Sequence, residues 1–223
     1  MRKHILEIDS VQKSFEGKSI LSDVYLKFET GEIVGLLGRN GCGKSTLLKI
    51  IFGIESANNK FIRIDGTVKN QTSSLLKEVS YLHQENFIPN NFSVKKAISL
   101  AIEKSEIAKF LEDELIESII DKNIRSLSGG ETRYLEIKLI LSNSSKFVLL
   151  DEPYNGLSPL MVEKTNILIL ENSRQKGIII TDHNYEKVIN IATKLILMKE
   201  GKVFHLKDKS ELVEKGYLRG GML

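Results

Sequence analysis

The stretch EIVGLLGRNGCGKSTLLKIIF, from Glu32 to Phe52, decides the fold of this chain. Its first part, Ile33 to Leu37, is apolar and predicts a buried strand, and its last part predicts a helix that begins at Lys44. A glycine-rich turn between them carries the phosphate-binding pattern G-x-x-x-x-G-K-[ST]. Strand, turn and helix together predict a loop that holds the phosphates of a nucleoside triphosphate.

The residue types in this turn suit phosphate binding. Glycines allow backbone N–H groups to turn inward and approach a phosphate closely, and the helix N-terminus adds its dipole and unpaired donors. Lys44 is expected to reach the β- and γ-phosphates, and the Ser45 hydroxyl to ligate Mg²⁺. The predicted nucleotide contacts are Gly38, Arg39, Asn40, Gly41, Cys42, Gly43, Lys44, Ser45 and Thr46.

Composition narrows the class of protein. The chain has 223 residues, enough for one large domain or a domain with an inserted subdomain. Its net charge of +3 is too small to indicate nucleic acid as a partner. Its single cysteine, Cys42, is expected to pack beneath the loop rather than to sense redox state. No apolar run is long enough to span a bilayer, so we expect a cytoplasmic chain whose membrane role requires a partner.

Alternating and continuous apolar patterns predict the strands. Residues 4 to 13 and 19 to 28 alternate apolar and polar, as half-buried antiparallel strands do. Short apolar runs predict buried strands at 78 to 82, 147 to 150 and 177 to 181, with helices between them. Such alternation indicates an α/β fold with a mainly parallel sheet, whose ligands lie at the carboxyl ends of the strands.

A helical insertion interrupts this alternation. From Ser93 to Asp121 the apolar residues follow a helical period, and the segment is rich in charge. We expect it to form a separate helical subdomain.

Two acidic residues follow the strand at 147 to 150. Asp151 at the carboxyl end of a strand beside a phosphate loop can hold Mg²⁺. Glu152 would then lie next to the γ-phosphate and polarise an attacking water. Alone, an Asp-Glu pair after a strand is usually a solvated turn, but the phosphate loop favours the catalytic interpretation.

The sequence LSGGE at 127 to 131 precedes another helix. Ser128, Gly129 and Gly130 offer a hydroxyl and open backbone donors, which is a second design for binding anions. The alternative is a plain N-cap. Because one loop already serves the phosphates of this chain, we expect the second loop to serve the nucleotide of a second copy.

Two further residues are candidates from their positions. Phe15 lies by a turn, where it either covers the core of the small sheet or forms a platform for a nucleotide base. His183 follows a buried strand and is expected to donate to the γ-phosphate and to hold Glu152 and the water in place.

Taken in order, these motifs resemble those of the nucleotide-binding subunit of ATP-binding cassette (ABC) transporters, over nearly the whole chain. The resemblance implies one ABC-type ATPase domain over 1 to 223 with a P-loop NTPase core. In it, approximately 1–84 and 145–223 form a RecA-like core with an N-terminal antiparallel β-subdomain, and approximately 85–144 form the α-helical signature subdomain. The matching residues are Phe15, GRNGCGKS at 38 to 45, Gln84 of the Q-loop, LSGGE, Glu152 after VLLD, and His183.

The resemblance also implies a mechanism. Two such subunits, identical or not, would bind head-to-tail around two ATP molecules and drive a separate membrane-spanning partner from the inner face of the membrane. Gln84 would join Glu152 and His183 in catalysis and Ser45 and Asp151 in binding Mg²⁺. Ser158 stands where the family usually has an aspartate, and the segment between Gln84 and Ser128 is short for the family. The motif GLSP and the pair Glu136-Ile137 are similar to those of the branched-chain amino-acid and lipopolysaccharide-export branches, which is too little to assign a substrate.

The partner is expected to dock after Gln84. Phe87, Ile88 and Phe92 form an apolar cluster in a loop there, and they either pack locally or expose a groove for a short helix of the partner. Two rival functions remain open. A soluble ABC-type ATPase without a transport role usually carries long insertions that this chain lacks. A small-molecule kinase would share the phosphate loop but would not explain LSGGE.

Overall fold

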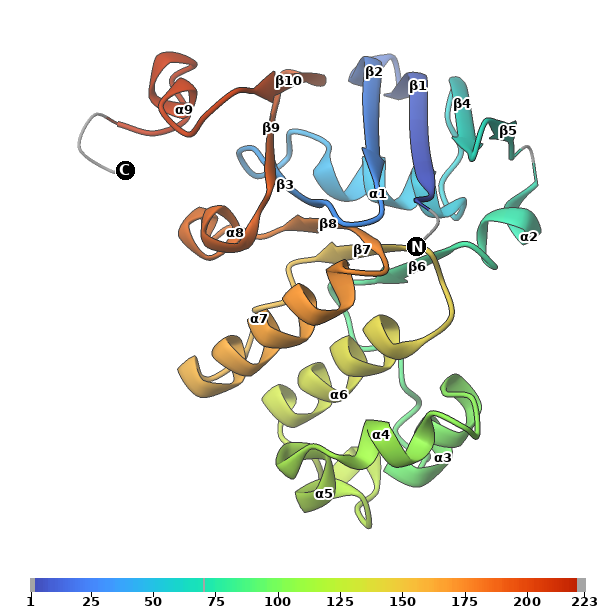
Figure 1. Cartoon of the computed structure of the whole chain (residues 1–223). Helices are drawn as coiled ribbons and strands as arrows, with labels where there is room; N and C mark the ends of the chain where they lie inside the picture. Colours follow the sequence, from blue (N-terminus) through green and yellow to red (C-terminus); the bar gives the residue numbers. More distant parts are fainter. Residues whose placement is uncertain (1–2, 70, 220–223) are drawn as a thin grey trace.

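The computed structural model describes residues 3–69 and 71–219. A small antiparallel sheet lies at one end of the molecule (Figure 1). Its strand order is β2-β1-β4-β5, and hairpin turns join its sequential neighbours. The strands are β1 Ile5–Phe15, β2 Lys18–Glu29, β4 Asn59–Ile64 and β5 Thr67–Val68. The alternation in the sequence therefore predicted this sheet correctly.

The larger sheet has the order β10-β9-β3-β8-β7-β6. The pairs from β9 to β6 are parallel, and β10 is antiparallel to β9. The prediction of an α/β fold with a mainly parallel sheet is confirmed. The strands are β3 Ile33–Leu37, β6 Val79–Leu82, β7 Phe147–Asp151, β8 Gly177–Thr181, β9 Lys194–Lys199 and β10 Lys202–Leu206.

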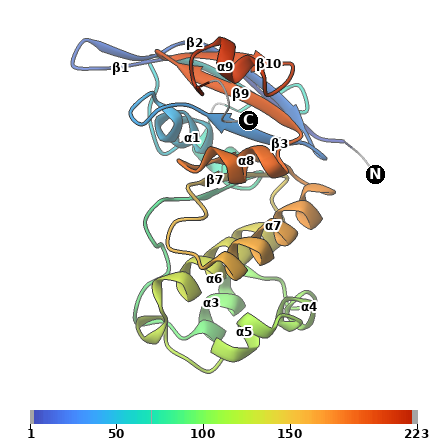
Figure 2. The ribbon, with the colours of Figure 1, turned by 90° about the vertical axis from the view of Figure 1, so that its left-hand side faces the viewer.

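Helices cover both faces of the larger sheet. Helix α1 (Lys44–Phe52) lies between the two sheets, and α6 (Gly129–Ser142) and α7 (Pro159–Ser173) run side by side below the larger sheet (Figures 1 and 2). Pro159 occupies the first turn of α7, as its fixed φ allows. Smaller helices complete this part: α2 Thr72–Leu75, α8 Tyr185–Ile191 and α9 Glu211–Glu214.

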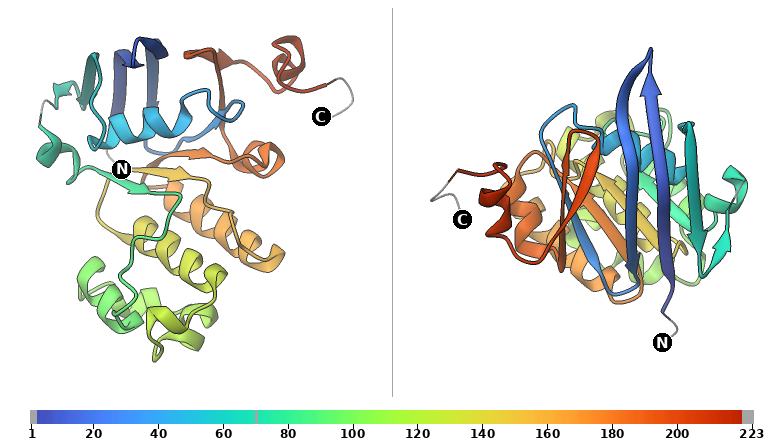
Figure 3. Two further views of the ribbon diagram at one scale, coloured as in Figure 1. Left: turned by 180° about the vertical axis from the view of Figure 1, so that it is seen from behind. Right: turned by 90° about the horizontal axis from the view of Figure 1, so that it is seen from above.

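Alternate residues of each central strand serve different cores. Val34 and Leu36 of β3 pack with α1 and the small sheet, whereas Ile33 and Leu37 pack with α6, α7 and α8. These side chains are fully buried. The strand is apolar throughout because a parallel sheet between two layers has no solvated face. Figure 3 shows the resulting layers from behind and from above.

The insertion forms a helical subdomain with its own core. Its short helices are α3 Val94–Ala101, α4 Ile107–Leu111 and α5 Glu114–Ile119, followed by a 3₁₀ turn at Ile124–Ser126. They pack against Tyr134, Leu135 and Leu139 of α6. The helical prediction is confirmed, with breaks between α3, α4 and α5; Ser93 caps α3 at the start of the segment, and Asp113 caps α5.

This core corrects one expectation about the loop after Gln84. Ile88 is only 7% exposed and packs with the helices of the subdomain, so its prediction as part of an exposed apolar groove is wrong. Phe92 is half-buried against the same core, and Phe87 is 46% exposed. Of the three, Phe87 presents the most apolar surface to solvent.

Over the described residues, none of the helices is both long enough and apolar enough to cross a bilayer.

Candidate nucleotide-binding site

The phosphate loop joins β3 to α1 as a compact turn. Gly41 and Gly43 have φ values of 78° and 108°, a region that favours glycine. At Gly43 a Cβ would also meet Leu21 Cδ2 at 2.9 Å, so this position needs glycine for space as well. Lys44 is 8% exposed, and its Nζ donates to the carbonyls of Gly38 at 2.7 Å and Arg39 at 3.3 Å. The ammonium therefore lies within the turn that is expected to bind phosphate.

Three predicted metal-binding residues meet beside this loop. Ser45 Oγ donates to Asp151 Oδ1 at 3.1 Å, and Gln84 Nε2 donates to Ser45 Oγ at 3.3 Å. They come from the start of α1, the end of β7 and the loop after β6. Because parallel strands end at the same edge of a sheet, residues far apart in sequence converge here.

A residue that sequence reasoning did not single out holds Asp151. The hydroxyl of Tyr81, on β6, donates to Asp151 Oδ2 at 2.9 Å. Burial raises the pKa of Tyr81 strongly, and the charge of Asp151 raises it further, so the hydroxyl stays a donor. Asp151 is 1% exposed, and both of its oxygens are thus engaged. The apolar-aromatic pattern of β6 gave no signal for this bond.

The hydroxyl, carboxylate and amide at this point fit Mg²⁺. That ion is usually held by one or two carboxylates together with substrate phosphates and water. Residues 3–69 and 71–219 contain no group of three or more His, Cys, Asp or Glu side chains placed to hold a metal. A metal at Ser45 and Asp151 would therefore depend on a triphosphate for its remaining ligands.

Glu152 and His183 lie on neighbouring strand ends. His183 Nδ1 is 3.9 Å from Glu152 Oε2, and the His183 side chain is 58% exposed. Glu152 has a φ of 50°, a conformation that is strained for a residue with a Cβ. Its backbone N–H donates to Thr181 O at 2.8 Å, which ties the two strand ends together.

Buried polar residues hold the loops that carry these two side chains. Asp182, 1% exposed, accepts hydrogen bonds from the backbone N–H groups of Tyr154 and Asn184 at 3.3 and 2.9 Å. Arg133 of α6 donates to the carbonyls of Asp151 and Glu152, each at 2.9 Å. Sequence reasoning missed both residues in these positions, although a charged residue inside an otherwise buried helix was a signal for Arg133.

The signature LSGGE forms a capped helix start. Ser128 Oγ accepts from Glu131 N at 3.2 Å, and Glu131 Oε2 accepts from Ser128 N at 2.7 Å. The plain N-cap is therefore present, while the Ser128 hydroxyl proton remains free to donate to another group. Among the residues that the structure describes, no hydrogen bond or ion pair joins 127–131 to 38–45.

Phe15 ends β1 with its ring 45% exposed. It is not one of the buried residues that form the core of the small sheet. The Nζ of Lys13 lies 4.4 Å from the centroid of the ring. An exposed aromatic face of this kind suits stacking with a nucleotide base.

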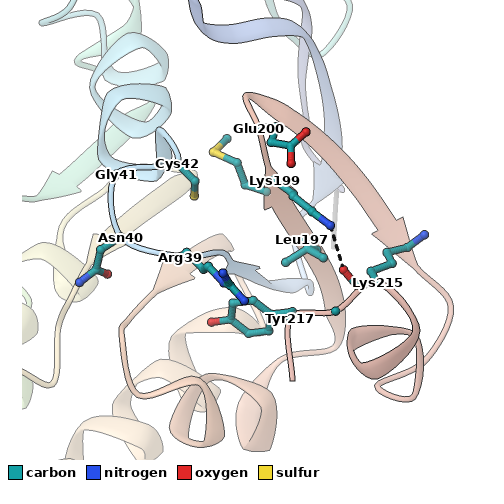
Figure 4. Close-up of a pocket in the computed structure, with 11 residues that line it drawn as sticks. Arg39, Asn40, Gly41, Cys42, Leu197, Lys199, Glu200, Lys215 and Tyr217 are labelled. Atoms are coloured by element: carbon teal, nitrogen blue, oxygen red, sulfur yellow. Dashed lines mark hydrogen bonds between the residues drawn. The ribbon is translucent and has the colours of Figure 1, made fainter. Parts of the chain in front are cut away.

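A cavity lies beside the phosphate loop on its β9 side (Figure 4). Its volume is about 360 Å³, and the loop, the end of β9 and the segment around Tyr217 form its walls. Lys199 Nζ donates to Lys215 O at 3.2 Å across one wall (Figure 4). Because β9 and β7 lie on opposite sides of β3, the cavity is distinct from the Ser45–Asp151 contact. Burial raises the pKa of the Cys42 thiol at its edge, which fits the expected packing role.

Comparisons with known proteins agree with these features. The family model described as "ABC transporter" matches residues 21–155. The lipopolysaccharide export system ATP-binding protein LptB of Haemophilus influenzae is 33% identical over 89% of this chain and 88% of its own length. The spermidine/putrescine import ATP-binding protein PotA of Nitratidesulfovibrio vulgaris is 27% identical over 96% of this chain and 61% of its own. A solved structure, titled "Structure of ATP binding subunit of ABC transporter", superposes with a TM-score of 0.85 at 21% identity, covering 97% of this chain and 95% of that one.

Proposed function

This chain belongs to the ABC transporter family as one of its ATP-binding subunits, and from that premise we propose how its site uses ATP. The chain is an ATPase by its family. The proposed reaction is hydrolysis of the bond between the β- and γ-phosphates of ATP bound at the phosphate loop. The expected products are ADP and inorganic phosphate.

The observation that carries this proposal is the convergence of Ser45, Asp151 and Gln84 next to the buried ammonium of Lys44. An ammonium, a hydroxyl, a carboxylate and an amide beside a glycine-rich turn are suited to bind a triphosphate and its metal ion. When bound, Mg²⁺ would neutralise charge on the β- and γ-phosphates. Ser45 and Asp151 would hold it, with Gln84 beside them.

Glu152 is proposed as the general base. Its carboxylate would accept a proton from the attacking water, and His183, 3.9 Å away, would orient that carboxylate and donate to the γ-phosphate. The backbone of Glu152 is fixed by Arg133 and by Thr181, so the carboxylate projects from a defined position. The N–H groups of the phosphate loop would bind the β-phosphate.

The signature is proposed to act in trans. Ser128, Gly129 and Gly130 begin a long helix but make no contact with the loop at 38–45 within the described residues. In a head-to-tail dimer each signature would face the γ-phosphate held by the other copy, so that two ATP molecules lie between the subunits. Phe15 would stack on the adenine ring.

A separate membrane-spanning partner is proposed to dock near Phe87 and Phe92, on the helical side of the Q-loop. Phe87 is the more exposed of the two. This arrangement would place the chain at the cytoplasmic face of the membrane. One relative is named for export of lipopolysaccharide and another for import of spermidine and putrescine. We propose that the membrane partner determines which substrate is transported.

The direct test combines nucleotide binding with assembly. Wild type should bind ATP with Mg²⁺, and Lys44→Ala should abolish binding because it removes the cation from the loop. In a Glu152→Gln background, which slows turnover, sedimentation should detect an ATP-dependent dimer. Adding Ser128→Arg should block that dimer by placing bulk and charge where the γ-phosphate belongs. A dimer that persists with Ser128→Arg would contradict the role of the signature in trans.

A further inference from the structure

Helix α6 lies between the larger sheet and the helical subdomain (Figure 2). Three of its charged residues are buried, Arg133, Glu136 and Lys138, and the first two form a pair. Arg133 is 3% exposed and Glu136 is fully buried. They lie three positions apart, so both side chains project from one side of the helix. Burial of two charges is unfavourable unless each finds specific partners. Their partners show what the pair connects.

Arg133 binds the end of the catalytic strand and the residue before Gln84. Its Nη2 donates to the carbonyls of Asp151 and Glu152, each at 2.9 Å. Its Nη1 donates to the carbonyl of His83 at 2.6 Å. One planar guanidinium thus fixes both loops that are expected to contact the γ-phosphate and its metal.

Glu136 binds the loop that follows Gln84. Its Oε1 accepts hydrogen bonds from the backbone N–H groups of Phe87 at 2.6 Å and Ile88 at 3.2 Å. Burial raises the pKa of this carboxyl, and those two N–H groups and the charge of Arg133 act in the opposite direction. The segment proposed to receive the membrane partner is therefore anchored by a buried side chain of the signature helix.

Arg133 and Glu136 form an ion pair and no hydrogen bond. Arg133 Nη1 lies 3.7 Å from Glu136 Oε2, an oxygen that accepts no hydrogen bond within the part of the chain that the structure describes. A shift of the guanidinium at the catalytic end would change this separation in a low-dielectric interior, where such changes are felt strongly. The side chains of Arg133 and Glu136 thus connect the carbonyl of Glu152 to the backbone N–H of Phe87.

We propose that Arg133 and Glu136 are positioning residues that transmit the state of the ATP site to the loop at 85–92, where the partner binds. This inference rests on the proposed function, since it takes ATP at the phosphate loop as the signal. With ATP and its metal bound, Gln84 and Glu152 are held in one arrangement, so both ends of the guanidinium are fixed. Glu136 then holds the amides of Phe87 and Ile88 more persistently.

Amide hydrogen exchange measures this persistence directly. In a Glu152→Gln background that retains ATP, exchange in 85–92 should slow when MgATP is added. Arg133→Lys should abolish this slowing while ATP binding persists, because one ammonium keeps the charge but cannot donate to all three carbonyls. Glu136→Gln, which keeps an acceptor oxygen for Phe87 and Ile88 but not the charge, should reduce the slowing. It provides a second test if Arg133→Lys does not fold.

The matched control is Lys138→Met on the same helix. Lys138 forms a buried ion pair with Asp113 at 2.7 Å, and this pair lies within the helical subdomain, away from the catalytic strand. A merely structural need for buried charge on α6 would make this variant lose the ATP response as well. We expect it to keep the response.

The outcomes separate the two proposals. If the Glu152→Gln parent fails to bind ATP in the same samples, the proposed function fails. If ATP binds but exchange in 85–92 does not slow, the inference about Arg133 and Glu136 is overturned while the function stands. The inference is likewise overturned if Arg133→Lys responds as the parent does, or if Lys138→Met loses the response to the same degree.

Discussion

Removing one hydroxyl, by Tyr81→Phe, should weaken the binding of Mg²⁺ by the enzyme. Tyr81 is 7% exposed, and its hydroxyl donates at 2.9 Å to an oxygen of Asp151, which is 1% exposed. The substitution keeps the ring, whose centroid lies 5.5 Å from that of Phe52. It leaves a buried carboxylate oxygen without a donor, which should lower the free energy of unfolding by about 1–3 kcal/mol.

The same loss should affect Mg²⁺ binding, because Tyr81 orients the carboxylate that is expected to hold the ion. Removing such a supporting hydrogen bond typically lowers metal affinity by about 10- to 100-fold. We therefore expect the Mg²⁺ concentration for half-maximal ATPase activity to rise by about tenfold or more. Binding of Mn²⁺ to the ATP complex, followed by electron paramagnetic resonance, provides a readout that does not depend on turnover.

Tyr134→Phe is a matched control. The Tyr134 hydroxyl donates at 2.8 Å to Asp113 Oδ2, and Tyr134 is 2% exposed, but this pair lies in the helical subdomain. It should cost less stability, because Lys138 Nζ also donates to Asp113 Oδ2 at 2.7 Å, and it should leave the Mg²⁺ dependence unchanged. The reasoning is refuted if Tyr81→Phe destabilises the fold without shifting the Mg²⁺ dependence, or if both variants shift it equally.

Two other substitutions address the docking surface and a buried charge. Phe87→Ser should weaken co-purification with the membrane partner at little cost in stability, because Phe87 is 46% exposed. As a control, Ile167→Ser on α7, where Ile167 is 55% exposed, should leave co-purification unchanged. Equal losses of co-purification in the two variants would contradict docking near Phe87. Burial lowers the pKa of Lys176 from 10.5 to about 8. As pH rises, the folded state therefore loses this proton at a lower pH than the unfolded state does. Between these two pH values the free energy of unfolding should rise by about 1.4 kcal/mol per pH unit. Urea unfolding across that pH range should show that the free energy of unfolding rises less steeply with pH for Lys176→Met than for wild type. An equal pH dependence in the two proteins would contradict the lowered pKa of Lys176.

Local signals predicted the elements that depend on neighbours in sequence. The helix start at Lys44 follows from a short pattern with a clear physical cause. The parallel sheet followed from alternation of apolar strands with helices. That sheet brings the ends of β3, β7 and β8 together, so the convergence near the phosphate loop could also be anticipated.

Side-chain partners distant in sequence could not be anticipated in this way. Tyr81 lies 70 positions from Asp151, and Arg133 lies 50 positions from His83. Such pairs cannot be identified from local sequence, because the first depends on the pairing of β6 with β7 and the second on the packing of α6 against the loop after β6. Ile88 was misjudged for the same reason: a single apolar residue in a loop gives no indication of whether the helical subdomain will cover it.

The role of Ser158 illustrates a position with a local explanation. It stands where the family usually has an aspartate, and its side chain accepts a hydrogen bond from Met161 N at 3.3 Å as the N-cap of α7. An aspartate can cap a helix in the same way. The structure therefore accounts for a capping residue at this position.

The central claim is that ATP is hydrolysed at the phosphate loop with Glu152 as the base. The most direct measurement is single-turnover hydrolysis of ATP with Mg²⁺ by wild type and Glu152→Gln, with bound ATP quantified in the same samples. We predict that Glu152→Gln binds ATP as wild type does but hydrolyses it more slowly by about 10²-fold or more, because the amide cannot accept the proton of water. Equal rates of hydrolysis in the two proteins would contradict the assignment.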